Sequence, residues 1–221
     1  METTNLTENT KVLENNMVNL TGEIVSEKRY SHEVYGEKFY IYDLAVARLS
    51  GENDLIPLTI SERLINLDEL NIGTKVTVEG QFRSYNKHEE NKNRLILSVF
   101  VRSIEILTEE DYSKNENSIK LDGFVCKKPN YRKTPLGREI TDLLIAVNRP
   151  YGKSDYIPCI VWGRNARYSS GIEVGSRVQI SGRIQSRTYK KKISETETED
   201  RIAYEVSVSK IETVFEETED K

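Results

Sequence analysis

The chain has 221 residues, of which 37% are hydrophobic and 31% charged, and its formal net charge is −4. This length accommodates one or two domains, and no apolar run approaches the roughly 20 residues of a membrane-spanning helix. The polar residues 1–17 lack the apolar centre of a secretion signal, so we expect a cytoplasmic protein without a membrane segment.

The first half of the chain contains five apolar or alternating runs, which predict strands. They cover residues 17–29, 38–49, 55–61, 74–85 and 94–107. Between the third and fourth runs, residues 63–70 fill the place of a short helix. Residues 108–117 are polar and acidic, and we interpret them as a linker.

The second half shows the same order of elements. Its predicted strands cover residues 119–127, 138–149, 155–162, 176–189 and 201–214, with a short helix or turn at 163–171. Residues 215–221 form an acidic tail.

The two halves are copies of one another. Ile56-Pro57 recurs as Ile157-Pro158, an offset of 101, and Gly80 recurs as Gly182, an offset of 102. A period near 100 is far longer than the roughly 20–50 residues of a solenoid repeat. We therefore predict one duplicated small domain, with copy one at residues 17–107 and copy two at residues 118–214.

Five short strands with a helix between the third and fourth are typical of the OB-fold, a five-stranded Greek-key barrel that binds oligonucleotides or oligosaccharides. An SH3-like barrel shares much of this pattern. The predicted fold class is all-β, with two OB-folds in tandem.

Charge is distributed very unevenly between the copies. Residues 120–193 carry 16 Lys and Arg against 5 Asp and Glu, a net charge of +11. Residues 18–107 carry 11 against 14, a net charge of −3. A strongly basic domain attracts polyanions, of which nucleic acid is the usual one.

Copy two also has aromatic residues suited to stacking on bases. Tyr156 and Trp162 are six residues apart on a predicted strand, so their side chains point to the same face. Aromatic platforms within a cationic groove bind single-stranded nucleic acid without reading its sequence. The predicted DNA-binding residues are Tyr131, Arg132, Lys133, Arg138, Arg149, Tyr151, Tyr156, Trp162, Arg183, Arg187, Tyr189, Lys190 and Lys191.

The order and spacing of several runs in copy two resemble the bacterial single-stranded DNA-binding protein family. These runs include Ile145-Ala146-Val147-Asn148-Arg149, the segment 156–163 and the segment 182–189, within a match of about residues 117–212. The resemblance implies base stacking at four positions that are all aromatic here: Tyr151, Tyr156, Trp162 and Tyr189. It implies non-specific binding and protection of single-stranded DNA in replication, recombination, repair or DNA transfer, near the nucleoid, with replication or repair proteins as partners. The chain ends Glu219-Asp220-Lys221, without the apolar tip through which that family recruits partners.

Copy one keeps the framework but not these aromatics, because the four positions fall on Ser50, Leu55, Ser61 and Lys87. We expect its binding face to be lost or changed. A separate set of aromatics lies at other positions of copy one: Phe39, Tyr40, Tyr42, Phe82 and Tyr85.

Two other functions remain open: an architectural OB protein that contacts protein partners with little or no DNA affinity, and an RNA-binding OB protein. The sequence contains no Gly-rich phosphate loop, nucleophile elbow or metal-ligand spacing, so we expect neither an enzyme nor a cofactor. Cys126 and Cys159 are expected to be reduced thiols.

We also expect a homodimer. The resemblance implies that chains with two OB-folds assemble in pairs, so that four folds are presented. A physical argument points the same way, because strands at residues 20–24 and 121–125 are expected to be exposed edges that a second chain would cover.

Overall fold

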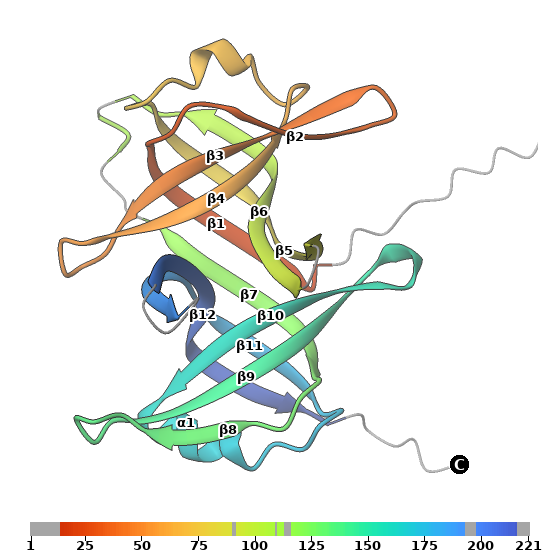
Figure 1. The fold of residues 1–221 in the computed structure, drawn as a ribbon, viewed down its shortest axis with the longest axis vertical. Helices are drawn as coiled ribbons and strands as arrows, with labels where there is room; N and C mark the ends of the chain where they lie inside the picture. Colours follow the sequence, from red (N-terminus) through yellow and green to blue (C-terminus); the bar gives the residue numbers. More distant parts are fainter. Residues whose placement is uncertain (1–13, 90–91, 109, 113–115, 193–197, 216–221) are drawn as a thin grey trace, which may run out of the picture.

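A computed structural model describes residues 14–89, 92–108, 110–112, 116–192 and 198–215, and their strands form one twelve-stranded sheet that closes into two barrels (Figure 1). Apart from Phe215, the acidic tail lies outside the described residues, as does most of the acidic loop at 193–199.

The first barrel closes in the order β1–β3–β4–β6–β5–β1. All neighbouring strands in it are antiparallel except β4 and β6, which are parallel. Its strands are β1 (Asn16–Ile24), β3 (Glu37–Ala47), β4 (Asn53–Ser61), β5 (Lys75–Glu89) and β6 (Lys92–Ile106).

The second barrel repeats this arrangement in the order β7–β9–β10–β12–β11–β7, again with one parallel pair, β10 and β12. Its strands are β7 (Asn117–Val125), β9 (Glu139–Arg149), β10 (Lys153–Trp162), β11 (Arg177–Lys192) and β12 (Thr198–Val214). Five strands closed in this order make an OB-fold, so the predicted fold class is confirmed for both copies.

Each copy has a sixth strand that the sequence did not predict. The strand predicted at 17–29 ends at Ile24, and β2 (Arg29–Val34) then pairs with β3 as an arm outside the barrel. The short strand β8 (Asn130–Lys133) pairs with β9 in the same way. Most residues of both strands are exposed, so these strands lack the apolar alternation on which prediction depends.

The helical segments are shorter in copy one. The segment predicted at 63–70 forms only a 3-10 helix, η1 (Leu67–Glu69), whereas copy two has the α-helix α1 (Gly163–Ser170). A second 3-10 helix, η2 (Pro150–Gly152), joins β9 to β10. No helix among the described residues is long and apolar enough to cross a membrane.

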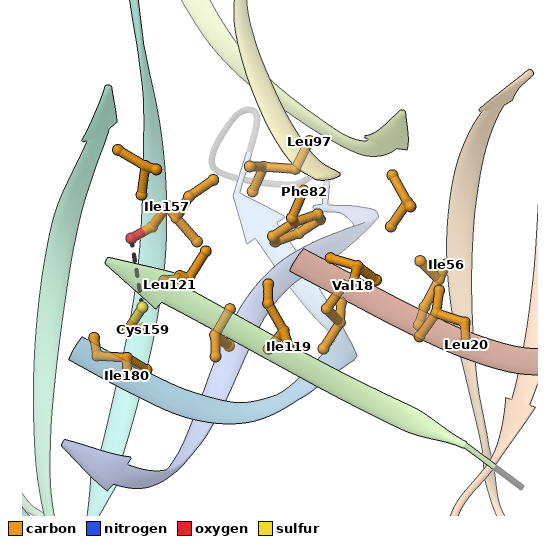
Figure 2. Packing of buried hydrophobic residues seen from close by; sticks show 14 of the residues in the cluster. Val18, Leu20, Ile56, Phe82, Leu97, Ile119, Leu121, Ile157, Cys159 and Ile180 are labelled. Carbon is orange, nitrogen blue, oxygen red and sulfur yellow. Dashed lines mark hydrogen bonds between the residues drawn. The ribbon is translucent and has the colours of Figure 1, made fainter. Parts of the chain in front are cut away.

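The two barrels join through their first strands. β1 and β7 pair antiparallel, and Val18 lies opposite Ile119, its own equivalent at an offset of 101. An approximate two-fold axis therefore passes through this pair. The apolar interiors are continuous across it: Figure 2 shows Val18 and Ile119 between Ile56 of copy one and Ile180 of copy two.

This pairing corrects one expectation. The edges at 20–24 and 121–125 are not exposed, because β1 lies between β5 and β7 and then meets β3, while β7 lies between β1 and β11 and then meets β9. The duplicated chain covers its own strand edges.

Gly80 and its equivalent Gly182 are required for the same structural reason. A Cβ atom at Gly80 would strike the carbonyl oxygen of Phe100, and one at Gly182 would strike that of Ser207. Both lie where the β5–β6 and β11–β12 registers shift by one residue. The close strand contact at each bulge leaves no room for a side chain.

Candidate nucleic-acid interface

The outer face of β10 carries the predicted stacking residues. Along this strand Ile157, Cys159 and Val161 are buried in the barrel, and Tyr156 and Trp162 are exposed by 42% and 37%. Both rings therefore project to solvent from one side of the strand. On the neighbouring strand β9, Ala146 lies opposite Tyr156 and Ile140 lies opposite Trp162, so neither ring faces another aromatic side chain there. We call this surface the aromatic face.

Tyr151 lies in the turn at the tip of the β9–β10 hairpin. Its side chain is 92% exposed, and its backbone φ of 62° is in the left-handed region, which tyrosine rarely adopts. A non-glycine residue there costs about 1–3 kcal/mol. The ring packs little against the protein, so packing does not explain this cost.

Tyr189 lies on β11, on the side where the two copies meet. The guanidinium of Arg187 is 5.9 Å from the centre of its ring. Tyr189 and Pro158 line the same groove, and Pro158 lies between Tyr156 and Trp162 on β10. The structure thus brings Tyr189 and the aromatic face to neighbouring parts of one surface.

β8 presents its predicted residues to two different sides. Arg132 forms an ion pair with Asp142, at 2.8 Å. The hydroxyl of Tyr131 instead donates to Glu139, which also pairs with Arg167 of α1. These contacts with Arg167 and the Tyr131 hydroxyl lower the pKa of the Glu139 carboxyl. Lys133 lies opposite Glu139, so Tyr131 and Lys133 lie toward α1 and away from the aromatic face.

Arg149 and Arg183 lie where the copies meet. Arg183 pairs with the buried Asp54 of copy one at 3.0 Å, and Asp54 also accepts a hydrogen bond from the backbone N–H of Ser186. Arg149 pairs with the buried Asp155 at 3.3 Å.

The contact at Asp155 mirrors the one at Asp54. Asp155 accepts from the backbone N–H of Ser84 in copy one, as Asp54 accepts from Ser186 in copy two. Burial raises the pKa of Asp155, partly offset by the Ser84 N–H and by Arg149. Sequence reasoning missed this reciprocal contact, although Arg48/Arg149 and Ser84/Ser186 already recur between the copies.

The remaining predicted cations are at loops and hairpin ends. Arg138 is exposed in the loop between β8 and β9, where its backbone N–H donates to Thr134. Lys190 and Lys191 lie near the end of β11, opposite Asp200 and Glu199 on β12. Glu199 itself pairs with Arg201 at 2.7 Å.

Copy one covers its corresponding face with its own side chains. His32 stacks on Phe39 with ring centres 4.8 Å apart, and Arg83 lies 3.8 Å over the ring of Phe100. Burial is the main reason that the pKa of Arg83 falls to about 10. Of the other aromatic residues of copy one, Tyr42 and Phe82 are fully buried, whereas Tyr85 is exposed. In the described part of this face of copy one, the rings of Phe39 and Phe100 are covered, and neither is exposed as Tyr156 and Trp162 are.

Within the described residues, no three or more His, Cys, Asp or Glu side chains gather as a metal site would require. Cys126 and Cys159 are free thiols, and burial raises the pKa of both.

Comparison with known proteins adds sequence relatives and a fold match. The model of the single-strand binding protein family matches residues 116–214. The single-stranded DNA-binding protein of Clostridium tetani is 36% identical over 83 residues, covering 34% of this chain and 57% of that protein. Single-stranded DNA-binding protein B of Bacillus subtilis is 34% identical over 80 residues, covering 33% of this chain and 71% of that protein. The chain spans about half the length of most of the curated relatives it matches.

A solved structure matches both barrels. The crystal structure of the wild-type single-stranded DNA binding protein from Thermus aquaticus aligns with a TM-score of 0.71 over 93% of this chain and 96% of that chain, at 20% identity. At this identity the match shows the fold alone, and it extends over both OB-folds.

Proposed function

We propose that this chain, which belongs to the single-strand binding protein family, binds single-stranded DNA without sequence specificity through copy two. The observation that carries the proposal is the pair of exposed rings, Tyr156 and Trp162, on one side of β10, in a copy whose residues 120–193 carry a net charge of +11. Every base has a π-face, so exposed rings bind single strands irrespective of sequence. Protection of single strands in replication, recombination, repair or DNA transfer is the process that such binding serves.

Within copy two, we assign stacking to Tyr151, Tyr156, Trp162 and Tyr189. Arg187, Lys190 and Lys191 lie beside Tyr189 and are suited to phosphate contacts. Arg149 and Arg183 are held by buried carboxylates, so we assign them to joining the copies.

The test is a binding titration with fluorescently labelled oligo(dT), followed by anisotropy. Trp162→Ala and Tyr156→Ala should each weaken binding by about 1–3 kcal/mol, the loss of one stacked base. Leu55→Ala, at the position in copy one that matches Tyr156, is the control and should leave affinity unchanged. The slope of log K against log salt should be negative by roughly 0.7 for each phosphate contact.

The alternatives give different results in the same titration. An RNA-binding protein would prefer oligo(U) over oligo(dT), and a protein-interaction module would bind neither. Equal loss of affinity from Leu55→Ala and Tyr156→Ala would contradict the assignment to copy two.

We further propose that two chains form a homodimer, through the outer face of the strand pair β1–β7 and not through the strand edges at 20–24 and 121–125. The outer face of the strand pair β1–β7 has no covering layer among the described residues, and it exposes Met17 and Phe124. Sedimentation equilibrium at micromolar concentration should give twice the chain mass of 25.5 kDa. A single-chain mass with DNA binding intact would show that two OB-folds suffice.

A further inference from the structure

The two copies enclose a groove that does not belong to either barrel alone. The hairpins β5–β6 and β11–β12 each reach toward the other copy, so that β5 contacts β10 and β11 contacts β4 (Figure 1). Between them lies a groove of about 760 Å³, lined by Tyr85 and Arg94 of copy one and by Tyr189, Lys191 and Lys192 of copy two, among others.

The groove is cationic. Five Lys and Arg side chains line it against one carboxylate, Asp43, and that carboxylate is already paired with Arg29 at 2.8 Å. Arg94, Lys191 and Lys192 have no ion-pair partner in the part of the chain that the structure describes. Their charge is therefore available to a polyanion.

The groove also holds aromatic rings from both copies. Tyr85 is 53% exposed, and Tyr189 faces the same space from the other hairpin. Corresponding positions carry the two residue types in opposite order: Tyr85 corresponds to Arg187, and Lys87 corresponds to Tyr189. At these two positions each hairpin therefore carries one aromatic and one cationic residue.

This groove continues the aromatic face. Pro158 lines it and lies on β10 between Tyr156 and Trp162, and Tyr189 lines it as well.

We propose that single-stranded DNA passes through this groove, with a base stacked on Tyr85 and a phosphate at Arg94. Copy one then contributes to binding despite its net charge of −3 and its covered outer face. This inference rests on the proposed function and extends the binding site beyond copy two. Its chemistry, rings interleaved with unpaired cations, is that of a single-strand channel.

The experiment uses the full chain and oligo(dT) from about 5 to about 40 nucleotides, because one OB-fold covers about 4–16. Tyr85→Ala should weaken binding of the longer oligonucleotides by about 5- to 150-fold and leave the shortest unaffected. Arg94→Gln should make the salt dependence shallower by about 0.7 in slope. The matched controls are Tyr35→Ala, an exposed tyrosine of copy one outside the groove, and Arg102→Gln, another exposed arginine of β6.

The outcomes separate this inference from the proposed function. If Trp162→Ala weakens binding but Tyr85→Ala and Arg94→Gln match their controls at every length, the groove is not part of the path and the function stands. If the unaltered chain does not bind oligo(dT), both fail. Tyr85→Phe retains the ring and should restore the affinity that Tyr85→Ala loses, which distinguishes stacking from damage to the hairpin.

Discussion

Removal of the Asp54 carboxylate should loosen the junction between the two barrels. The Asp54 side chain is fully buried, and it accepts from the Ser186 N–H at 2.7 Å, from Arg48 Nε at 2.9 Å and from an Arg183 terminal nitrogen at 3.0 Å. Asp54→Ala leaves these donors without their acceptor and removes the negative charge between two cations.

Loss of one partner from a buried ion pair costs about 3–5 kcal/mol. Arg48 and Arg183 are 25% and 41% exposed, so water reaches both guanidiniums after the change. We therefore expect a loss near the lower bound, about 3 kcal/mol. With a denaturant slope of about 2–3 kcal/mol per molar, the urea midpoint should fall by roughly 1 M.

The assay is equilibrium urea unfolding at pH 7, followed by circular dichroism. Asp68→Ala is the control, because Asp68 pairs with Lys28 at 2.9 Å on the surface, where ion pairs contribute little. A midpoint for Asp54→Ala no lower than that for Asp68→Ala would refute the role of the buried carboxylate in joining the copies.

Three further predictions follow from the geometry. Tyr151→Ala should weaken oligo(dT) binding, whereas Tyr35→Ala, at an equally exposed residue that also has positive φ, should leave the anisotropy titration unchanged. The pKa of Asp122 is held below its usual value, chiefly by the hydrogen bond from Arg177 at 2.8 Å. The ionised carboxylate therefore stabilises the fold above its unfolded-state pKa of 3.8, and this stabilisation is lost as the pH falls through the lower folded-state pKa. Asp122→Asn should therefore be less stable than the unaltered chain at pH 7 and equally stable in strong acid, as thermal melts across pH will show. Gly182→Ala should lower the free energy of unfolding by roughly 1–3 kcal/mol through overpacking, whereas Gly171→Ala, where a Cβ atom meets only ordinary contacts, should cost much less.

The barrels were predictable because the chain contains two copies of the same pattern of apolar residues. The same apolar alternation occurs at an offset near 101, and all ten barrel strands lie where the sequence predicts strands. The arms β2 and β8 escaped prediction because their outward residues are mostly polar or aromatic and exposed, so no buried face imposes a pattern.

The contact between the copies could not be predicted from strand patterns alone. Strand alternation shows which residues face a barrel interior, but β1 and β7 pair through backbone hydrogen bonds that any sequence can make. A different signal was present. Residues shared by both copies, such as Arg48 and Arg149, join the barrels, whereas residues that differ, such as Ser61 and Trp162, distinguish the covered face of copy one from the aromatic face of copy two.

The candidate site shows why charge alone assigns cations poorly. Arg149 and Arg187 read alike in the sequence, but the first lies against the buried Asp155, whereas the second lies beside Tyr189 with Glu205 at 3.9 Å. Similarly, Tyr131 and Arg132 are neighbours on β8 and face opposite sides. The cations that join the copies are the ones whose carboxylate partner is fully buried, Asp155 for Arg149 and Asp54 for Arg183.

The central claim, that copy two binds single strands on its aromatic face, is tested most directly by the intrinsic fluorescence of Trp162, the only tryptophan in the chain. Stacking of a base on the exposed indole should quench this emission strongly and saturably when oligo(dT) is added at low salt, and duplex DNA should quench it far less. Unchanged Trp162 emission at concentrations where anisotropy shows oligo(dT) bound would place the DNA elsewhere and contradict the account.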